Sequence, residues 1–145
     1  MRGLVQRVLR ASVSVGGDVI GEIGPGLCVL IGVTHDDTDA TARKLADKVW
    51  GLRVMDDDNG VMNRSIADTT REVLVVSQFT LYGDTSGGRR PSWINAARPE
   101  HAEPLISTVI DQLRGAGATV ATGRFRTEML VSLVNDGPVT LMLEV

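Results

Sequence analysis

One short segment near the C-terminus, Asn-Asp-Gly-Pro-Val-Thr at residues 135–140, restricts the possible folds of this chain more than any other. It lies between two apolar runs, residues 129–134 and 139–145, that both have the composition of buried strands. Proline has no N–H for a strand ladder and glycine weakens a strand interior, so the Gly137-Pro138 pair needs an explanation. It could form a hairpin turn, because Asn, Asp, Gly and Pro reverse a chain between apolar runs. It could instead contain a cis Gly-Pro bond that turns two neighbouring carbonyls the same way.

The first third of the chain predicts three strands joined by tight turns. Residues 2–15 form one long valine-rich strand pattern, and Gly-Gly-Asp at 16–18 predicts a hairpin into residues 19–23. A Gly-Pro-Gly turn at 24–26 precedes residues 27–33, a nearly unbroken apolar run that is typical of a central strand. We therefore expect these strands to form a three-stranded meander.

Two helices are predicted in the remainder of the chain. The first covers about residues 40–51 and is capped by Thr38 or Asp39, and the second runs from residue 98 or 99 to Arg114. Glycines 115 and 117 end the second helix. Further strands are expected at residues 53–55, 72–76 and 119–122 and in the two C-terminal runs. This order favours an α+β fold with an antiparallel sheet and two main helices, and it does not favour a βαβ alternation.

Composition limits the class of protein. The 145 residues are 43% hydrophobic, enough for the core of a single domain spanning residues 1–145. Aromatic residues make up 3% of the chain, which argues against a base-stacking surface for single-stranded nucleic acid, and the net charge of −3 provides no basic excess for unspecific phosphate binding. The chain has no membrane-length apolar span and no secretory leader pattern. We expect a soluble, cytoplasmic protein that makes no contact with membranes.

The chain has few of the residues that usually carry catalysis. His35 and His101 stand in no recognisable triad spacing, and Cys28 lies in an apolar run where a core role is expected. The acidic segment 56–60 lacks the spaced ligands of a calcium loop and is interpreted as a solvated turn. No zinc or phosphate-loop motif is present, so we expect neither a metal nor a cofactor. An enzyme built from this chain would work with backbone donors, hydroxyls and the groups of its substrate.

Two motifs together resemble a known family. Ser77-Gln78-Phe79-Thr80-Leu81 follows the strand predicted at 72–76, and residues 135–140 form the second motif. The pair resembles the two signature motifs of the D-aminoacyl-tRNA deacylase family. Supporting matches extend over the whole chain, at residues 6–8, 24–27, 88–92 and 123–125.

The resemblance implies a fold, an assembly and an activity. It implies a homodimer in which each subunit combines a barrel-like, antiparallel-sheet-rich domain with flanking helices. The implied reaction is hydrolysis of the ester that joins a D-amino acid to the 3′-terminal ribose of tRNA. By the same resemblance, the adenosine and ester site is formed by Ser77, Gln78, Phe79 and Thr80. The implied chirality filter is a cis Gly137-Pro138 element that enters the pocket of the partner subunit, with Asn135 and Asp136 beside it and Arg7 as its brace.

Physical reasoning adds expectations about mechanism. Backbone N–H groups around Phe79 and Thr80 would stabilise the oxyanion, and Thr80 would act either in positioning or as the only plausible protein nucleophile. A filter that excludes L side chains by a clash should also let glycine through, so glycyl-tRNA is an expected substrate. The sequence departs from the commoner family pattern at residues 126–129, where Arg-Thr-Glu-Met replaces a more usual Gly-Ala-Asp-Met, and at Trp93, where phenylalanine is expected.

Two other functions remain open at this stage. One is a nucleic-acid-binding module without catalysis, in which phosphates contact Arg89, Arg90, Arg124 and Arg126. The other is a homo-oligomer that binds a small molecule in the same pocket and does not depend on the tRNA.

Overall fold

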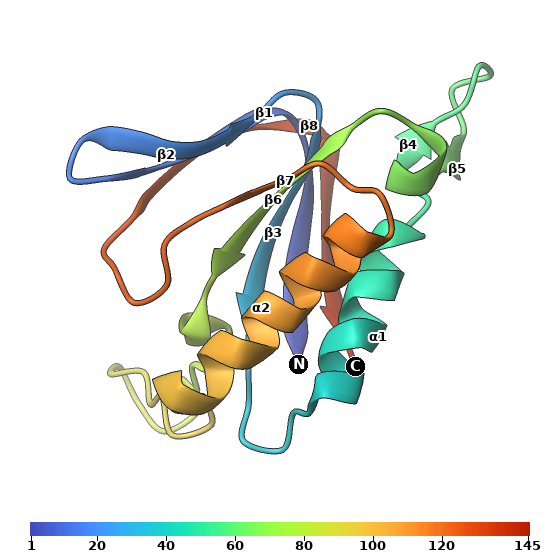
Figure 1. Cartoon of the computed structure of the whole chain (residues 1–145). Coiled ribbons are helices and arrows are strands. Elements are labelled where there is room, and N and C mark those ends of the chain that lie inside the picture. Colours follow the sequence, from blue (N-terminus) through green and yellow to red (C-terminus); the bar gives the residue numbers. More distant parts are fainter.

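The computed structural model describes residues 1–145 and contains eight strands and two α-helices (Figure 1). The strands are β1 (Arg2–Val15), β2 (Asp18–Ile23), β3 (Gly26–Gly32), β4 (Met55–Asp56), β5 (Met62–Arg64), β6 (Glu72–Ser77), β7 (Val120–Thr122) and β8 (Leu130–Glu144). The α-helices are α1 (Asp39–Trp50) and α2 (Pro99–Gly115), and two short 3₁₀ helices cover Ile66–Asp68 and Phe79–Tyr82.

Strand β1 organises the main sheet. Its second half pairs with β2 and its first half with β3, while β8 pairs with it along most of its length, all three antiparallel. The predicted hairpin between β1 and β2 is confirmed, with Gly16 and Gly17 at φ 60° and 95° in the turn. The predicted meander is wrong, because β3 pairs with β1 and not with β2. After the Gly-Pro-Gly turn the chain therefore continues along the same edge of β1, with β2 beside its second half and β3 beside its first half, and β8 lies on the opposite edge.

The other half of the sheet is parallel. Strand β3 pairs with β6 and β6 with β7, both in parallel, and helices α1 and α2 lie in the two connections. The sequence pattern did not favour a βαβ alternation, but this half of the sheet contains two such units, β3-α1-β6 and β6-α2-β7. The α+β single domain with two main helices is confirmed, and its sheet is mixed.

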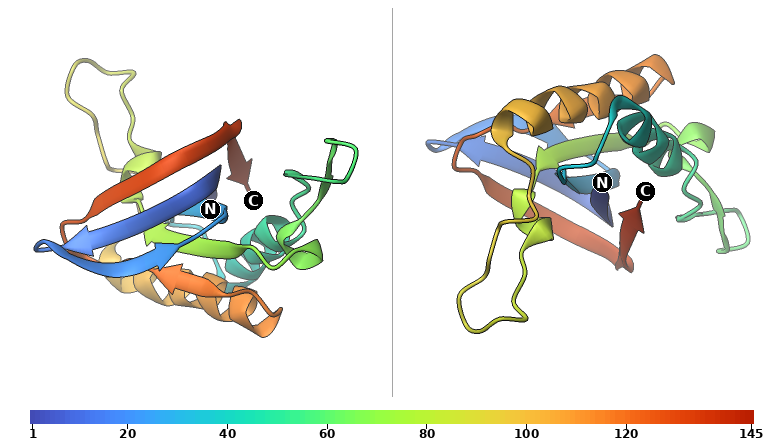
Figure 2. Two further views of the ribbon diagram at one scale, coloured as in Figure 1. Left: turned by 90° about the horizontal axis from the view of Figure 1, so that it is seen from above. Right: turned by 90° about the horizontal axis from the view of Figure 1, so that it is seen from below.

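The sheet is strongly curved and nearly closes into a barrel (Figure 2). Strands β2 and β7 approach each other at Gly21, where an added Cβ would lie 2.7 Å from the Thr122 carbonyl oxygen. Only glycine allows so close an approach of two backbones. The barrel-like architecture implied by the family resemblance is thus present.

The core has two parts, one on each side of the sheet. Leu27, Val29 and Ile31 of β3 pack in a cluster with the apolar faces of α1 and α2, which lie side by side over one face of the sheet (Figure 1). Cys28, between them in sequence, faces the opposite side and joins a smaller cluster. The first helix starts at its predicted cap, Thr38, whose side chain accepts from the Thr41 N–H. Neither helix has both the length and the apolar character needed to cross a membrane.

The C-terminal segment forms one strand, β8, and not two strands joined by a turn. The hairpin interpretation of residues 135–140 is wrong, because the whole of β8 pairs with the same neighbour, β1. Gln6 faces Thr140 and Val8 faces Asn135, so residues 136–139 bulge out of the ladder opposite Arg7. A bulge of this kind accommodates a proline that has no N–H to donate.

Candidate active site

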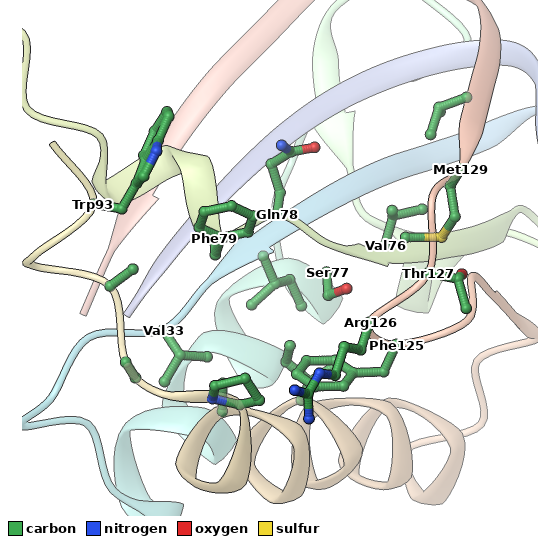
Figure 3. A pocket seen from close by; sticks show the side chains of 17 residues that line it. Val33, Val76, Ser77, Gln78, Phe79, Trp93, Phe125, Arg126, Thr127 and Met129 are labelled. Atoms are coloured by element: carbon green, nitrogen blue, oxygen red, sulfur yellow. The ribbon is translucent and has the colours of Figure 1, made fainter. Parts of the chain in front are cut away.

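A cavity of about 590 Å³ lies where β6 ends, a volume typical of small-molecule sites (Figure 3). Twelve of its 17 lining residues are hydrophobic. One wall comes from the ends of β3 and β6, another from the first turns of α2, and a third from the connection between β7 and β8. The lining residues are Ile31, Val33, Val76, Ser77, Gln78, Phe79, Trp93, Ala96, Ala97, Pro99, Ala102, Ile106, Phe125, Arg126, Thr127, Met129 and Val131.

The polar motif that follows β6 lies at this cavity. The strand ends at Ser77, and the Gln78 N–H still donates to the Ile31 carbonyl at 2.7 Å. The chain then turns into the 3₁₀ helix that starts at Phe79. Because the first N–H groups of a helix have no acceptor within it, the amides of Phe79 and Thr80 make no hydrogen bond in the chain. Two backbone donors are therefore free beside an apolar cavity.

The side chains of the motif divide between the cavity and its rim. Ser77, Gln78 and Phe79 line the cavity, whereas Thr80 does not. The Thr80 hydroxyl accepts a short hydrogen bond from the Gln78 side-chain amide. The Phe79 ring packs edge-to-face on Trp93, with centroids 5.5 Å apart, and both rings are partly exposed (Figure 3).

No general base stands at the cavity. His35 Nε2 lies 2.7 Å from the Ile94 carbonyl oxygen, and His101 Nε2 lies 2.9 Å from that of Asp37, so both imidazoles have backbone partners. Burial raises the pKa of Cys28 to about 11 and is the main cause that raises the pKa of Tyr82 to about 12. Neither group ionises near neutral pH.

The second motif forms a separate cluster on β8. The Gly137-Pro138 bond is cis, and both residues are exposed. The buried Arg7 side chain lies behind them, and its Nε is 3.2 Å from a carboxylate oxygen of Asp136 and 3.3 Å from the Asp136 carbonyl. The Asn135 side-chain amide donates to the carbonyls of Arg7 and Val139, at 2.9 and 3.1 Å.

Gly137 allows this cluster to be compact. Its φ is +118°, and an added Cβ would lie 2.8 Å from Arg7 Nη2 and 2.9 Å from a methyl group of Val139. Arg7 is fixed in turn by the Val54 carbonyl at 2.7 Å and an Asp56 carboxylate oxygen at 3.3 Å. The exposed Gly137-Pro138 tip therefore rests on a buried, hydrogen-bonded arginine.

The structure brings the predicted site residues together as two groups, not one. Ser77, Gln78 and Phe79 line the cavity with Thr80 adjacent, while the Arg7 cluster, with Asn135, Asp136, Gly137 and Pro138, contributes nothing to its lining. Sequence reasoning missed most of the remaining walls. Ala102 and Ile106 belong to the apolar face of the second predicted helix, a pattern that predicts packing against the core. The pattern does not indicate that part of this face borders a cavity.

Comparison with known proteins identifies the family. The family model described as D-Tyr-tRNA(Tyr) deacylase matches residues 4–144. The chain belongs to this family.

Relatives along the full length carry the same activity in their names. A D-aminoacyl-tRNA deacylase of Symbiobacterium thermophilum is 57% identical over 144 residues, covering 99% of this chain and 95% of that protein. One of Streptomyces coelicolor is 55% identical over 146 residues and covers all of both chains. Family membership makes the chain an enzyme, a hydrolase that acts on the ester bond of D-aminoacyl-tRNA.

Solved structures match the fold closely. One described as a c-Myc DNA unwinding element binding protein has a TM-score of 0.95 at 40% identity, covering 100% of this chain and 99% of that one. Another, described as a probable eukaryotic D-amino acid tRNA deacylase, has a TM-score of 0.85 at 17% identity, covering 99% of this chain and 98% of that one. At that lower identity the likeness concerns the fold alone.

Proposed function

We propose that the chain removes D-amino acids from tRNA in the cavity at the end of β6 and rejects L-aminoacyl groups by means of the Gly137-Pro138 tip of a second copy. The observation that carries this proposal is the pair of free amides at Phe79 and Thr80 beside an apolar cavity with no general base. Aminoacyl-tRNA is made and used in the cytoplasm, so we propose that compartment for the activity.

The amides of Phe79 and Thr80 would stabilise the transition state. Attack of water on the ester carbonyl puts negative charge on its oxygen, and an oriented N–H donor is typically worth about 3 to 4 kcal/mol to that charge. The apolar walls strengthen such an interaction by excluding water. The 2′-hydroxyl of the terminal ribose lies next to the ester and can help to orient the attacking water, so no protein base is needed.

Thr80 acts in positioning and not as a nucleophile in this mechanism. Its hydroxyl is engaged by the Gln78 side chain and has no adjacent base to take its proton. The hydrogen bond ties the side chain of Gln78 to the first turn of the 3₁₀ helix and so supports the orientation of the free amides.

The selectivity comes from exclusion. D and L enantiomers bury similar apolar surface, so a hydrophobic pocket separates them weakly. A rigid backbone element can reject one of them by a clash and by leaving carbonyls without partners. The Gly137-Pro138 tip has suitable support, because Arg7 and Asn135 hold both sides of the bulge. Glycine has no side chain to reject, so glycyl-tRNA is a proposed substrate as well.

A homodimer would bring the two groups together. The tip is exposed and does not line the cavity of its own chain, so in this proposal a second copy supplies it. Strand β8 pairs on one side only and exposes several large apolar side chains, among them Leu130, Val131, Leu141 and Met142. An exposed apolar edge strand of this length is a typical protein interface. Sedimentation equilibrium should give twice the mass of the chain.

The decisive experiment is a deacylation assay on one tRNA charged with D-alanine, L-alanine or glycine. We expect hydrolysis of the D-alanyl and glycyl esters and little hydrolysis of the L-alanyl ester. Equal rates on both enantiomers would refute the filter while leaving the esterase intact. Failure on all three would refute the proposed activity.

A second candidate is nucleic-acid binding without catalysis. It is favoured by the likeness to the structure described as a c-Myc DNA unwinding element binding protein. It is also favoured by the exposed arginines 89, 90, 124 and 126, none of which has a side-chain partner in the chain. The net charge of −3 speaks against it. Salt-dependent binding of tRNA without release of the amino acid would favour this candidate over the first.

A further inference from the structure

Arg126 is the only charged residue among those that line the cavity. It lies in the connection between β7 and β8, and its φ of 59° makes it the only residue other than glycine with a positive φ. The left-handed region is uncommon for a long side chain. The chain therefore places a guanidinium at an otherwise uncharged cavity, at a backbone position better suited to glycine.

This guanidinium has no partner within the chain. Arg2, Arg7, Arg43 and Arg64 form ion pairs with carboxylates, whereas the Arg126 side chain, like those of Arg53 and Arg124, makes neither an ion pair nor a hydrogen bond. Arg126 is exposed at the edge of the cavity, and a cation at a protein surface interacts with an incoming anion more strongly than one in bulk water does. The arrangement is suited to a ligand that carries a negative group at this end of the cavity.

The position of Arg126 indicates which group that is. In Figure 3 its side chain enters from the β7–β8 connection and extends toward the α2 side, whereas Phe79 and Trp93 come from the opposite side of the cavity. If the ester lies at the amides of Phe79 and Thr80, the ribose extends across the cavity. The ester is attached at the 3′ carbon of that ribose and the phosphate at its 5′ carbon, on the other side of the ring.

We propose that the Arg126 guanidinium binds the phosphate on the 5′ side of the terminal adenosine and so positions the ester at the free amides. This inference rests on the proposed function for the place of the ester. A guanidinium matches a phosphate because two parallel N–H groups can donate to two oxygens. Every aminoacyl-tRNA carries this phosphate, whereas an acidic side chain is present in few of them. Arg126 thus contributes to affinity for the tRNA end without touching the reacting atoms.

The test compares two small substrates that differ only in this phosphate, the D-alanyl 3′-esters of adenosine and of adenosine 5′-monophosphate. Arg126→Gln removes the charge, Arg126→Lys restores a cation without the planar fork, and Arg53→Gln is the control. Arg53 is an exposed arginine without a side-chain partner, outside the cavity. For Arg126→Gln we expect kcat/KM on the phosphorylated ester to fall about tenfold, mostly through KM, with less than about a twofold change on the other ester. Arg126→Lys should recover part of the loss.

Equal effects of Arg126→Gln on the two esters, or no effect on either, would overturn the inference. A loss on the D-aspartyl ester of adenosine that is absent on its D-alanyl ester would also overturn it, because Arg126 would then bind the amino-acid side chain. Binding of adenosine 5′-monophosphate and adenosine, measured by calorimetry, is independent of hydrolysis. A preference for the monophosphate that Arg126→Gln abolishes supports the inference even if no ester is cleaved, and the absence of a preference refutes it.

Discussion

The two signature regions of the chain are opposites in shape and chemistry. The segment after β6 borders a cavity with apolar walls and leaves two backbone donors without acceptors. The Gly137-Pro138 region is an exposed tip, and the polar groups behind it are paired through Arg7 and Asn135. One region has unused hydrogen-bonding capacity and a place for a ligand, and the other has rigidity without a cavity.

This difference indicates that one region is suited to catalysis and the other to selection of the enantiomer. Free donors beside an apolar cavity can stabilise charge that develops in a reaction, so the first region is suited to chemistry. A rigid tip with paired polar groups excludes ligands of the wrong shape, so the second region is suited to selection. Substitutions in the first region should therefore change the rate, and substitutions in the second should change the D-to-L ratio.

The largest effect is expected from removal of a free amide by Phe79→Pro. Proline is tolerated at the first position of a helix, and the preceding Gln78 lies outside the helical region, at φ −145° and ψ 77°. Phe79→Ala is the matched control, because it also loses the ring but keeps the N–H group. We expect kcat on D-alanyl-tRNA to be about 100 to 1,000 times lower for Phe79→Pro than for Phe79→Ala, with the enantiomer ratio of the control unchanged.

Equal kcat values for the two variants would show that the Phe79 amide does not contact the developing charge. Circular dichroism and urea unfolding of both proteins should establish that the fold is kept. A changed D-to-L ratio in Phe79→Ala would contradict the assignment of catalysis to the region after β6 and of enantiomer selection to the Gly137-Pro138 region.

A smaller effect, on the other region, is expected from Arg7→Leu. The substitution leaves the Val54 carbonyl and the carboxylates of Asp56 and Asp136 without their partner. We expect a loss of about 2 to 3 kcal/mol in the free energy of unfolding, measured in urea. Because the tip loses its support, hydrolysis of L-alanyl-tRNA should rise relative to that of D-alanyl-tRNA.

The control for Arg7→Leu is Arg10→Leu, at an exposed arginine on the same strand with no side-chain partner. Its effect on stability should stay within about 0.5 kcal/mol. An Arg7→Leu protein that is destabilised but keeps its full enantiomer ratio would show that Arg7 supports the fold and not the tip.

Local sequence signals predicted most of the secondary structure. The turn at Gly16-Gly17, the cap at Thr38 and the helix that starts at Pro99 were all foreseen, because each depends on neighbouring residues. The short strand expected at 53–55 begins only at Met55. The two motifs of the site were also found, through their resemblance to the family and not through their physics.

Long-range arrangement was harder to predict. Nothing in residues 27–33 tells whether β3 pairs with β1 or β2, and the parallel pairing of β3 with β6 joins segments more than 40 residues apart. The hairpin interpretation of Gly137-Pro138 followed turn chemistry, but local sequence could not show that the segments on both sides of this pair align with the same strand, β1. The division of the site into two groups follows from this pairing.

The smallest effect concerns the sheet that joins the two regions. Cys28 lies in the buried cluster that includes Val8, next to Arg7, and Val76, which lines the cavity. Burial raises the pKa of the thiol from 9.0 to about 11, so the thiolate fraction at pH 8 is about 100 times lower than in the unfolded chain. If the two regions are held by a rigid sheet, Cys28 should react with a thiol reagent at pH 8 only after denaturation in urea. Fast labelling of the folded protein would show that the sheet opens.

The same shift in the pKa of Cys28 has a consequence for stability. The folded protein holds the thiol proton more tightly than the unfolded chain, so this contribution to stability is complete below pH 9.0 and declines as the pH rises toward about 11. Urea unfolding at pH 8 and pH 10.5 should show the decline, and Cys28→Ala should reduce it, because alanine cannot ionise. An equal decline in the wild-type protein and in Cys28→Ala would show that other groups cause the loss of stability. The labelling rate of Cys28 would then be the remaining measure of how rigidly the sheet connects the cavity to the tip.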